Sequence, residues 1–285
     1  MSRSIHLFLI FIMLAGLFLP VSFVRAQDTS HPEKVGIPGT HQDELGCSGE
    51  WQPDCDQTLL VYDAEDGVWQ AEFLIEPNND DDKKGPRYKV ALNGTWDENY
   101  GKNASRGGAD IPLVVSQPTR VKFYYDHQTH WITDNYNQPV IVATGDFQSQ
   151  LGCSNNNDAG CLRSWLQDPD GDDLFTFSTS ALQAGTYSVT LAREENPQNT
   201  ISETTQFTVK ADGDEIYFGY DTVKKEFIIS NEGAPRCSLS KQKAHWVRRD
   251  SILWNTVGSP KYQYSRVYSP DAALELTANG LEGGV

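Results

Sequence analysis

The segment 91–101 concentrates the side chains best suited to bind a sugar. It holds tryptophan, tyrosine, asparagine, aspartate and glutamate directly after a strand-like run. Aromatic faces cover the apolar C–H side of a sugar ring, while amides and carboxylates bind its hydroxyl groups. We therefore predict a carbohydrate-binding site formed by Asn93, Trp96, Asp97, Asn99 and Tyr100. The alternative for Trp96 is that its ring plugs the core of the domain.

Motifs that would indicate an enzyme do not occur in the sequence. There is no Gly-x-Ser-x-Gly elbow, no phosphate-binding loop and no His-Glu-x-x-His pattern. Two facing carboxylates would suffice for glycoside hydrolysis, but the sequence does not single out a pair among its 39 acidic residues. We assign no catalytic residue and expect no cofactor.

Two motifs offer ligands that a metal ion could use. In Asp126-His127-x-x-His130 the two imidazoles would lie about 10 Å apart and on opposite faces if the segment continued a strand. The acidic run 168–173 lacks the full ligand spacing of a calcium loop. We interpret the first motif as polar surface and the second as a solvated turn, and we predict no metal site.

The composition narrows the classes of partner. The chain has 285 residues and a formal net charge of −16, with 22% charged and 11% aromatic residues. This balance is typical of about two folded domains rather than of a disordered chain. A negative field repels phosphate groups, which argues against nucleic acid and anionic membranes as partners. A neutral, polar ligand fits the charge.

The N-terminus has the pattern of a secretory signal peptide. Arg3 precedes the apolar run 5–24, and Val24-Arg25-Ala26 provides an exit with small or branched residues at the two key positions. Cleavage after Ala26 predicts a signal peptide over 1–26, an extracellular location and no membrane association of the mature chain. The alternative is an uncleaved membrane anchor, because the run is nearly long enough to span a bilayer.

Two halves of the sequence repeat one pattern. Leu45-Gly46-Cys47 returns 106 residues later as Leu151-Gly152-Cys153. Three further matches follow in the same order: Val68-Trp69 with Leu174-Phe175, Tyr88-x-Val90-x-Leu92 with Tyr187-x-Val189-x-Leu191, and Val121-x-Phe123-x-Tyr125 with Ile216-x-Phe218-x-Tyr220. Ordered matches of this kind predict tandem copies of one module, over 31–137 and 138–231.

The cysteines follow the same repeat. Four of the five form two pairs with equal spacing, and four cysteines allow three pairings. The repeated spacing favours the local disulfides Cys47–Cys55 and Cys153–Cys161, each closing a short loop that stabilises the fold by about 2.6 kcal/mol. Cys237 is left over and lies beyond both copies.

Short runs rich in β-branched and aromatic residues predict strands. In the first copy they are residues 59–62, 68–73, 88–92 and 120–125, separated by clusters of Gly, Pro, Asn and Asp. No long stretch has helical periodicity. The fold class predicted is all-β, with tandem antiparallel β-sandwich modules of immunoglobulin-like type.

The second copy departs from the first at the candidate site. Where the first has the aromatic segment 91–101, the second has Ala192-Arg193-Glu194-Glu195-Asn196-Pro197, without an aromatic residue. A purely structural tryptophan should recur in a repeat, so its absence favours a ligand role for Trp96. After residue 231 the sequence no longer matches the repeat, and 236–285 is strand-like and short. We predict that it is the partial opening of a third β unit.

Four segments carry a resemblance to a known family: 41–47, 51–55, 91–101 and 123–130. They are similar to the tandem accessory modules of bacterial pullulanases and amylopullulanases, which are β-sandwiches related to starch-binding domains. The tail 244–270 resembles the opening of the pullulanase domain that precedes the catalytic barrel. The match is strong for the first copy and looser for the second.

This resemblance implies a function in starch metabolism outside the cell. The family debranches α-1,6 bonds, and its nucleophile and general acid lie in a (β/α)₈ barrel whose motifs do not occur here. We therefore expect an accessory region that binds α-glucan (starch, pullulan or glycogen) and is not active alone. The alternatives are a structural spacer without a ligand and a working glycoside hydrolase built on a sandwich.

Overall fold

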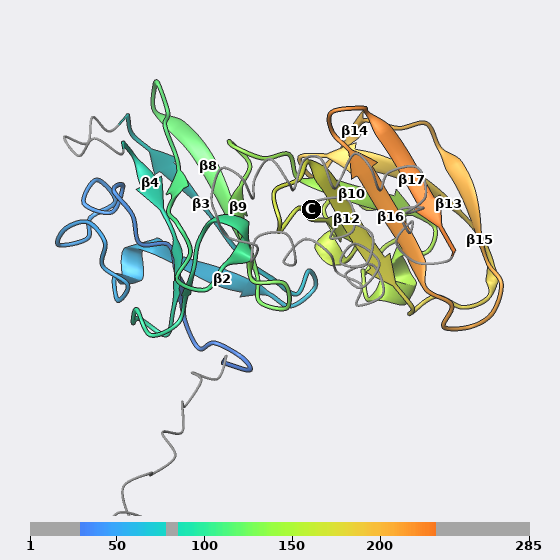
Figure 1. Ribbon diagram of the computed structural model, residues 1–285, viewed down its shortest axis with the longest axis horizontal. Coiled ribbons are helices and arrows are strands. Elements are labelled where there is room, and N and C mark those ends of the chain that lie inside the picture. Colours follow the sequence, from blue (N-terminus) through green and yellow to red (C-terminus); the bar gives the residue numbers. More distant parts are fainter. Residues whose placement is uncertain (1–28, 78–84, 232–285) are drawn as a thin grey trace, which may run out of the picture. The chain divides into compact units, whose positions relative to one another are not determined.

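The computed structural model describes residues 29–77 and 85–231 (Figure 1). Apart from the loop Asp168–Gly171, this part of the chain divides at Pro139–Val140 into two compact units. The predicted signal peptide, the predicted third unit and Cys237 lie outside the described residues. Every strand pairing is antiparallel, and the predicted all-β sandwich class is confirmed.

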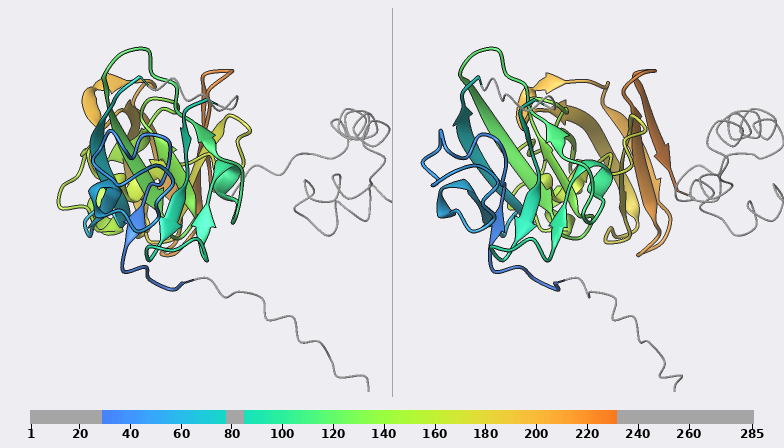
Figure 2. Two further views of the ribbon diagram at one scale, coloured as in Figure 1. Left: turned by 90° about the vertical axis from the view of Figure 1, so that its left-hand side faces the viewer. Right: turned by 60° about the vertical axis from the view of Figure 1, so that its left-hand side comes forward.

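Helical structure in the two described ranges is limited to short 3-10 turns. They are η1 (Asp56–Thr58), η2 (Lys102–Ala104), η3 (Gln148–Leu151) and η4 (Leu162–Ser164). None of these turns approaches the length and apolar character that a membrane-crossing helix needs. Figure 2 shows the strands and loops from two further sides.

The first unit is built on a seven-stranded path in the order β6-β5-β1-β2-β3-β8-β9, with β4 and β7 as a separate pair. Its strands are β1 (Val35–Gly36), β2 (Leu59–Asp63), β3 (Val68–Ile75), β4 (Arg87–Tyr88), β5 (Val90–Leu92), β6 (Asn99–Tyr100), β7 (Ile111–Pro112), β8 (Thr119–Asp126) and β9 (Trp131–Asp134).

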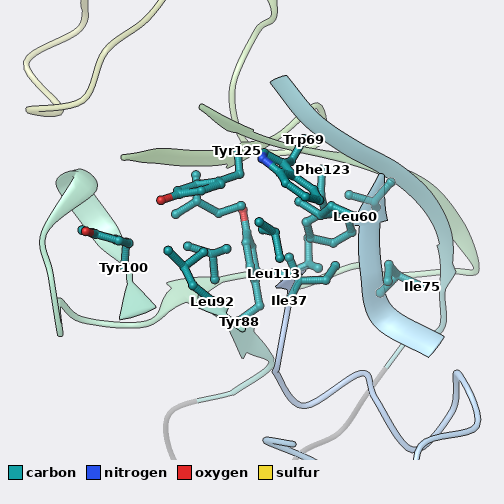
Figure 3. Close-up of a cluster of buried hydrophobic side chains, with 14 of the residues drawn as sticks. Ile37, Leu60, Trp69, Ile75, Tyr88, Leu92, Tyr100, Leu113, Phe123 and Tyr125 are labelled. Atoms are coloured by element: carbon teal, nitrogen blue, oxygen red, sulfur yellow. The ribbon is translucent and has the colours of Figure 1, made fainter. Parts of the chain in front are cut away.

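The core of the first unit joins the two halves of this path. Val35 of β1 and Leu92 of β5 share one buried cluster with Phe123 and Tyr125 of β8. Figure 3 labels Leu92, Phe123 and Tyr125 in this cluster. These four side chains are at most 1% exposed. The path therefore folds back into two facing layers, as a sandwich requires.

The second unit divides its strands between two sheets. One has the order β11-β10-β13-β14 with β15 also paired to β13, and the other has the order β12-β16-β17. The strands are β10 (Ile141–Gly145), β11 (Trp165–Leu166), β12 (Leu174–Thr179), β13 (Gly185–Arg193), β14 (Asn196–Thr200), β15 (Thr205–Val209), β16 (Ile216–Asp221) and β17 (Glu226–Ser230). Phe207 of β15 meets Phe218 of β16 edge to face at 5.2 Å, which joins the two sheets.

Both predicted disulfides are present. Cys47 pairs with Cys55, and Cys153 pairs with Cys161, with a Cα–Cα distance of 5.9 Å in each. Each bond closes the loop that precedes a 3-10 turn, η1 in the first unit and η4 in the second.

The structure shifts one of the repeat matches by two residues. Leu92 pairs with Val35 in the first unit, and Arg193 pairs with Ile141 at the corresponding place in the second. The sequence match had aligned Leu92 with Leu191. Because a shift of two residues keeps every side chain on the same face of the strand, the hydrophobic pattern could not reveal it.

Candidate functional site

Trp96 lies at the surface, in the loop between β5 and β6. Its side chain is 41% exposed, and it is not part of the hydrophobic core of the first unit. The loop leaves β5 through Asn93 and Gly94, whose φ angles are 54° and 69°. The backbone N–H of Leu92 donates to the Glu98 carbonyl (2.9 Å) and closes the loop. The core-plug alternative for Trp96 therefore does not describe this structure.

Asn93 and Asn99 shape the loop through their side chains. Asn93 Oδ1 accepts the backbone N–H groups of Glu33 (2.8 Å) and Lys34 (3.3 Å), which fastens the preceding chain to the loop. Asn99 Nδ2 donates to the carbonyl of Trp96 (2.8 Å) and fixes that residue's backbone. Both asparagines thus position the loop.

Asp97 is the acidic residue of the predicted site that lies at the surface. It is exposed and follows Trp96 directly, and its carbonyl accepts a bond from Arg106 Nη2 (3.1 Å). A carboxylate beside an exposed indole can accept hydrogen bonds from sugar hydroxyls.

Tyr100 is placed in the core rather than at the surface. Its side chain is 2% exposed, and its hydroxyl donates to Glu98 Oε1 (2.9 Å; the ring is labelled in Figure 3). The ring stacks on His130 at 4.2 Å with an interplanar angle of 6°. Because β6 turns this ring inward, Tyr100 offers no face to a ligand, and we leave it out of the candidate surface.

Trp51 joins the candidate surface, although the sequence analysis did not select it. It lies in the loop closed by the Cys47–Cys55 disulfide, and its ring centroid is 6.4 Å from that of Trp96, with planes inclined by 36°. The signal available in the sequence was a second tryptophan in a polar loop next to a disulfide. Its distance from Trp96 along the chain concealed the pairing.

Arg87 supports the Trp51 ring. Its guanidinium carbon lies 5.2 Å from the ring centroid, in cation–π contact. The Arg87 side chain is only 11% exposed and is fixed by Asp110 Oδ2 (3.1 Å) and the Gly85 carbonyl (2.6 Å). A partly buried, doubly anchored cation holds one side of the indole in a fixed orientation.

A buried glutamine fastens the disulfide loop that carries Trp51. Gln42 is 0% exposed, and its Nε2 donates to the Gln52 carbonyl (2.9 Å) and to Thr58 Oγ1 (2.8 Å). Its Oε1 accepts the N–H groups of Gln52 (2.7 Å) and Gly39 (3.4 Å). One side chain thereby ties three segments together.

The second unit repeats this arrangement. Gln148 is also 0% exposed; its Nε2 donates to the Asp158 carbonyl (2.8 Å) and to Ser164 Oγ (3.2 Å). Its Oε1 accepts the N–H groups of Asp158 (2.8 Å) and Gly145 (3.2 Å). The sequence contained this signal, since Gln148 follows Gln42 at the same offset as the cysteines.

The two histidines that the sequence placed on opposite faces come together. His130 lies in the turn after β8 with φ at 59°, and its ring centroid is 5.3 Å from that of His127. Tyr125 Oη lies 2.9 Å from His127 Nδ1 and 3.3 Å from His130 Nδ1. His127 Nε2 lies 2.5 Å from the Thr29 carbonyl and must donate to it, because a carbonyl only accepts. These contacts with Tyr125 and Thr29 hold the two imidazole rings in place.

Glu98 binds the same N-terminal segment. Its Oε2 accepts the backbone N–H (2.8 Å) and the hydroxyl (2.5 Å) of Thr29. Burial by itself raises the pKa of Glu98, but the hydrogen bonds from Thr29 and Tyr100 stabilise the carboxylate more strongly and lower the pKa below its ordinary value. The carboxylate is therefore ionised at neutral pH and anchors the chain that enters β1.

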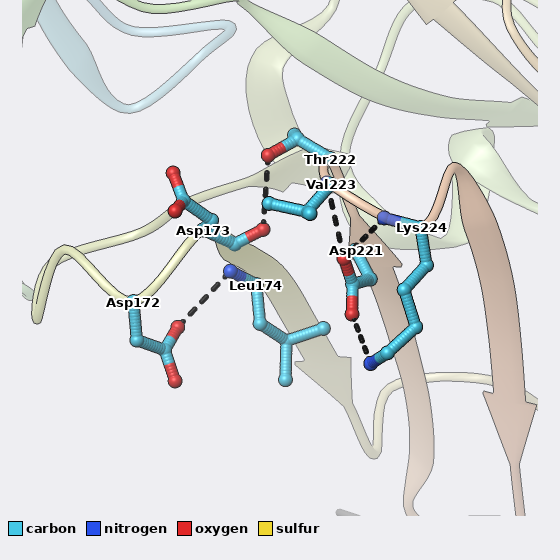
Figure 4. Close-up of polar contacts among 7 residues, drawn as sticks. All are labelled: Asp172, Asp173, Leu174, Asp221, Thr222, Val223 and Lys224. Atoms are coloured by element: carbon cyan, nitrogen blue, oxygen red, sulfur yellow. Dashed lines mark hydrogen bonds and ion pairs between the residues drawn. The ribbon is translucent and has the colours of Figure 1, made fainter.

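The acidic segment 168–173 forms a hydrogen-bonded turn. Asp168 Oδ1 accepts a backbone N–H three residues on (2.9 Å), and Asp172 Oδ1 accepts the N–H of Leu174 (3.0 Å; Figure 4). One ligand atom each of Asp168, Asp170 and Asp172 lies within 4.8 Å of the others. Two of the three carboxylates already bind backbone groups, as side chains of acidic turns do, and the interpretation as a solvated turn stays our prediction.

The fold and this surface define a tandem β-sandwich protein with an exposed aromatic loop on its first unit. Residues 34–132 and 140–227 match the family model described as the pullulanase X25 domain. The chain belongs to the pullulanase X25 domain family. The resemblance to pullulanase accessory modules that the sequence indicated is thereby confirmed.

Similar proteins carry related segments in much longer chains. The chain is 35% identical over 106 residues to an amylopullulanase of Thermoanaerobacterium thermosulfurigenes. The aligned segment covers 37% of this chain and 5% of that protein. It is 35% identical over 100 residues to an amylopullulanase of Thermoanaerobacterium saccharolyticum, covering 35% and 7%. Among solved structures, it aligns with the pullulanase from Bacillus acidopullulyticus with a TM-score of 0.32 and 16% identity, over 71% of this chain and 29% of that one. The chain thus matches only a small fraction of these curated relatives.

Proposed function

We propose that this chain is an α-glucan-binding accessory region, with the binding surface on the loop of the first unit that presents Trp96. The observation that carries the proposal is the exposure of Trp96, 41%, on a loop closed by backbone and asparagine hydrogen bonds. An exposed indole held rigidly loses little entropy when a sugar stacks on it. The proposed partners are starch, pullulan and glycogen.

Charge and chemistry support a neutral polysaccharide as the ligand. The chain carries a net charge of −16, and uncharged glucans approach such a surface without repulsion. The exposed carboxylate of Asp97 stands next to Trp96 and can accept hydroxyl hydrogen bonds. Because the chain belongs to a family named for pullulanase, we propose an α-glucan as this polysaccharide.

Secretion is part of the same proposal. Two disulfides are present in the described residues, and disulfides persist mainly in oxidising, extracellular spaces. The predicted signal peptide over 1–26 agrees with this. A soluble polysaccharide too large to enter a cell must be bound outside it.

Affinity electrophoresis tests the proposal. We expect amylopectin in the gel to retard the chain and Trp96→Ala to run nearly unretarded. Tyr62→Ala is the matched control, because Tyr62 is an aromatic residue of the same unit with the same 41% exposure, and it should be retarded like the wild type. A wild type that runs equally with and without amylopectin would leave the spacer alternative in place.

A reducing-sugar assay with pullulan separates binding from catalysis. We expect no maltotriose from this chain alone, because the proposal gives it no catalytic residue. Release of maltotriose by the purified chain would instead support the hydrolase alternative.

A further inference from the structure

Trp51 adopts a backbone conformation that tryptophan seldom takes. Its φ angle is 56°, in the left-handed region where Cβ crowds the backbone of every residue except glycine. A bulky aromatic residue at such a position costs folding free energy, and strain of this kind concentrates where a side chain has a function.

The second unit contains the same turn with an asparagine. Asn157 also has a φ angle of 56°, and its N–H donates to the Gly145 carbonyl (2.9 Å), as the Trp51 N–H donates to the Gly39 carbonyl (3.3 Å). Asparagine adopts this conformation more readily than most residues. The turn is therefore required by the framework, and the framework gains nothing from a tryptophan in it.

Burial of the Trp51 ring in the core does not offset this cost. Neither Trp51 nor Trp96 belongs to the hydrophobic cluster of the first unit. The Trp51 ring instead contacts Trp96 and the partly buried guanidinium of Arg87. Arg87, which is 11% exposed, supports the ring, and Trp96, which is 41% exposed, extends the aromatic surface.

We infer that Trp51 and Trp96 form one two-ring platform that binds consecutive sugars of a curved, α-linked glucan. This inference rests on the proposed function and names the second ring of its site and the shape of its ligand. Planes inclined by 36° cannot both lie flat against a straight, ribbon-like β-1,4 chain. Successive sugars of an α-1,4 chain are turned relative to one another and match inclined faces. Arg87 is a positioning residue for Trp51.

Calorimetry of the full chain with maltoheptaose and with cellohexaose tests the platform. The decisive variant is Trp51→Asn, which places in the first unit the residue that the second unit already uses in the same turn. We expect Trp51→Asn to weaken maltoheptaose binding about tenfold and to leave the melting temperature unchanged or raised. Trp96→Ala should weaken binding similarly, Tyr62→Ala should not, and cellohexaose should bind far more weakly than maltoheptaose.

The other outcomes overturn the platform, the curved ligand or the proposed function. If Trp96→Ala loses affinity and Trp51→Asn does not, the platform is wrong while the proposed function stands. If Trp51→Asn lowers the melting temperature by several degrees, Trp51 is a structural residue and the platform is again wrong. Equal binding of cellohexaose and maltoheptaose overturns the curved ligand. Absence of heat with any maltooligosaccharide overturns the proposed function itself.

Discussion

The two units use one framework and differ in what they attach to it. Gln42 and Gln148 make the same four kinds of hydrogen bond beside equivalent disulfides. By contrast, the β5–β6 loop of the first unit carries Trp96, whereas β13 and β14 of the second meet in a tight turn at Glu194 and Glu195. The framework serves folding in both units, and at this place in the fold the first unit has an aromatic loop where the second has a short acidic turn.

At two equivalent positions of the framework the units have different residues. Trp51 occupies the left-handed turn that Asn157 occupies in the second unit. His41 stacks on Phe123 at 5.9 Å, where Phe147 of the second unit stacks on Phe218 at 5.7 Å. In each pair the second unit has the residue that suits the fold better. Only the departure at Trp51 lies at the candidate binding surface, whereas His41 is buried against Phe123.

Removal of the buried glutamine should have the largest effect and should strike both units alike. Gln42→Ala leaves the N–H and carbonyl of Gln52 and the hydroxyl of Thr58 without this partner in a buried place, which we expect to destabilise the first unit by about 3–4 kcal/mol. Gln148→Ala should do the same to the second unit. Calorimetric unfolding scans of the full chain measure both, with the exposed Gln117→Ala as control. A large loss of stability from only one of the two substitutions would show that the glutamine does not stabilise both units equally.

Acid should affect the two units differently, because among residues 29–77 and 85–231 only the first unit has a buried histidine, His41. Burial lowers the pKa of His41 to about 4, against the weaker opposing influence of a hydrogen bond with the Ile37 backbone. Nε2 of His41 is buried without a hydrogen-bond partner in the described structure, so a proton there would be poorly solvated.

The sign of this effect follows from the two states of the chain. Below about pH 6.5 the histidine binds a proton in the unfolded chain, whereas in the folded chain it binds one only near pH 4. Above pH 6.5 His41 does not reduce the free energy of unfolding. As the pH falls from 6.5 to 4, this free energy decreases by about 3 kcal/mol. His41→Phe, which copies Phe147, should remove this dependence in pH-dependent urea unfolding. An unchanged acid profile in the variant would assign the acid sensitivity to other groups.

The sequence predicted the fold because its signals are local. Cysteine spacing, short β-rich runs and the ordered repeat predicted the disulfides and the β-sandwich class without knowledge of distant contacts. The two-residue shift between Leu92 and Arg193 escaped because strand faces have a period of two. The same argument explains why a single sequence rarely fixes strand register.

The candidate site was predicted less well, because it depends on direction and on contacts far apart in the chain. Tyr100 and Trp96 are both aromatic and four residues apart, yet β6 turns one ring into the core while the loop leaves the other exposed. Trp51 reaches Trp96 only through the fold. Composition drew attention to this loop, but it could not tell which of its rings are exposed.

The N-terminal anchor is a smaller difference between the units. Glu98→Gln keeps the shape but loses the ionised acceptor for Thr29, and we expect a loss of about 1 kcal/mol. Because the hydrogen bonds hold the pKa of Glu98 below its ordinary value, their contribution is present at neutral pH and decreases as the pH falls below about 4.5. Hydrogen exchange of the chain entering β1 should quicken in the variant, while the second unit stays unaffected. Equal exchange in both proteins would contradict the anchor.

The smallest expected change in stability belongs to Trp96, the residue on which the proposed binding surface rests. Trp96→Ala removes an exposed ring outside the core, so we expect the free energy of unfolding to change by less than about 0.5 kcal/mol. Tyr100→Ala, four residues further on, should instead cost about 3 kcal/mol, because it empties a buried site and leaves Glu98 Oε1 without its donor. Urea unfolding of the two variants measures this contrast. A loss from Trp96→Ala that approaches the loss from Tyr100→Ala would mean that the indole supports the loop's fold, and its exposure would no longer argue for a ligand.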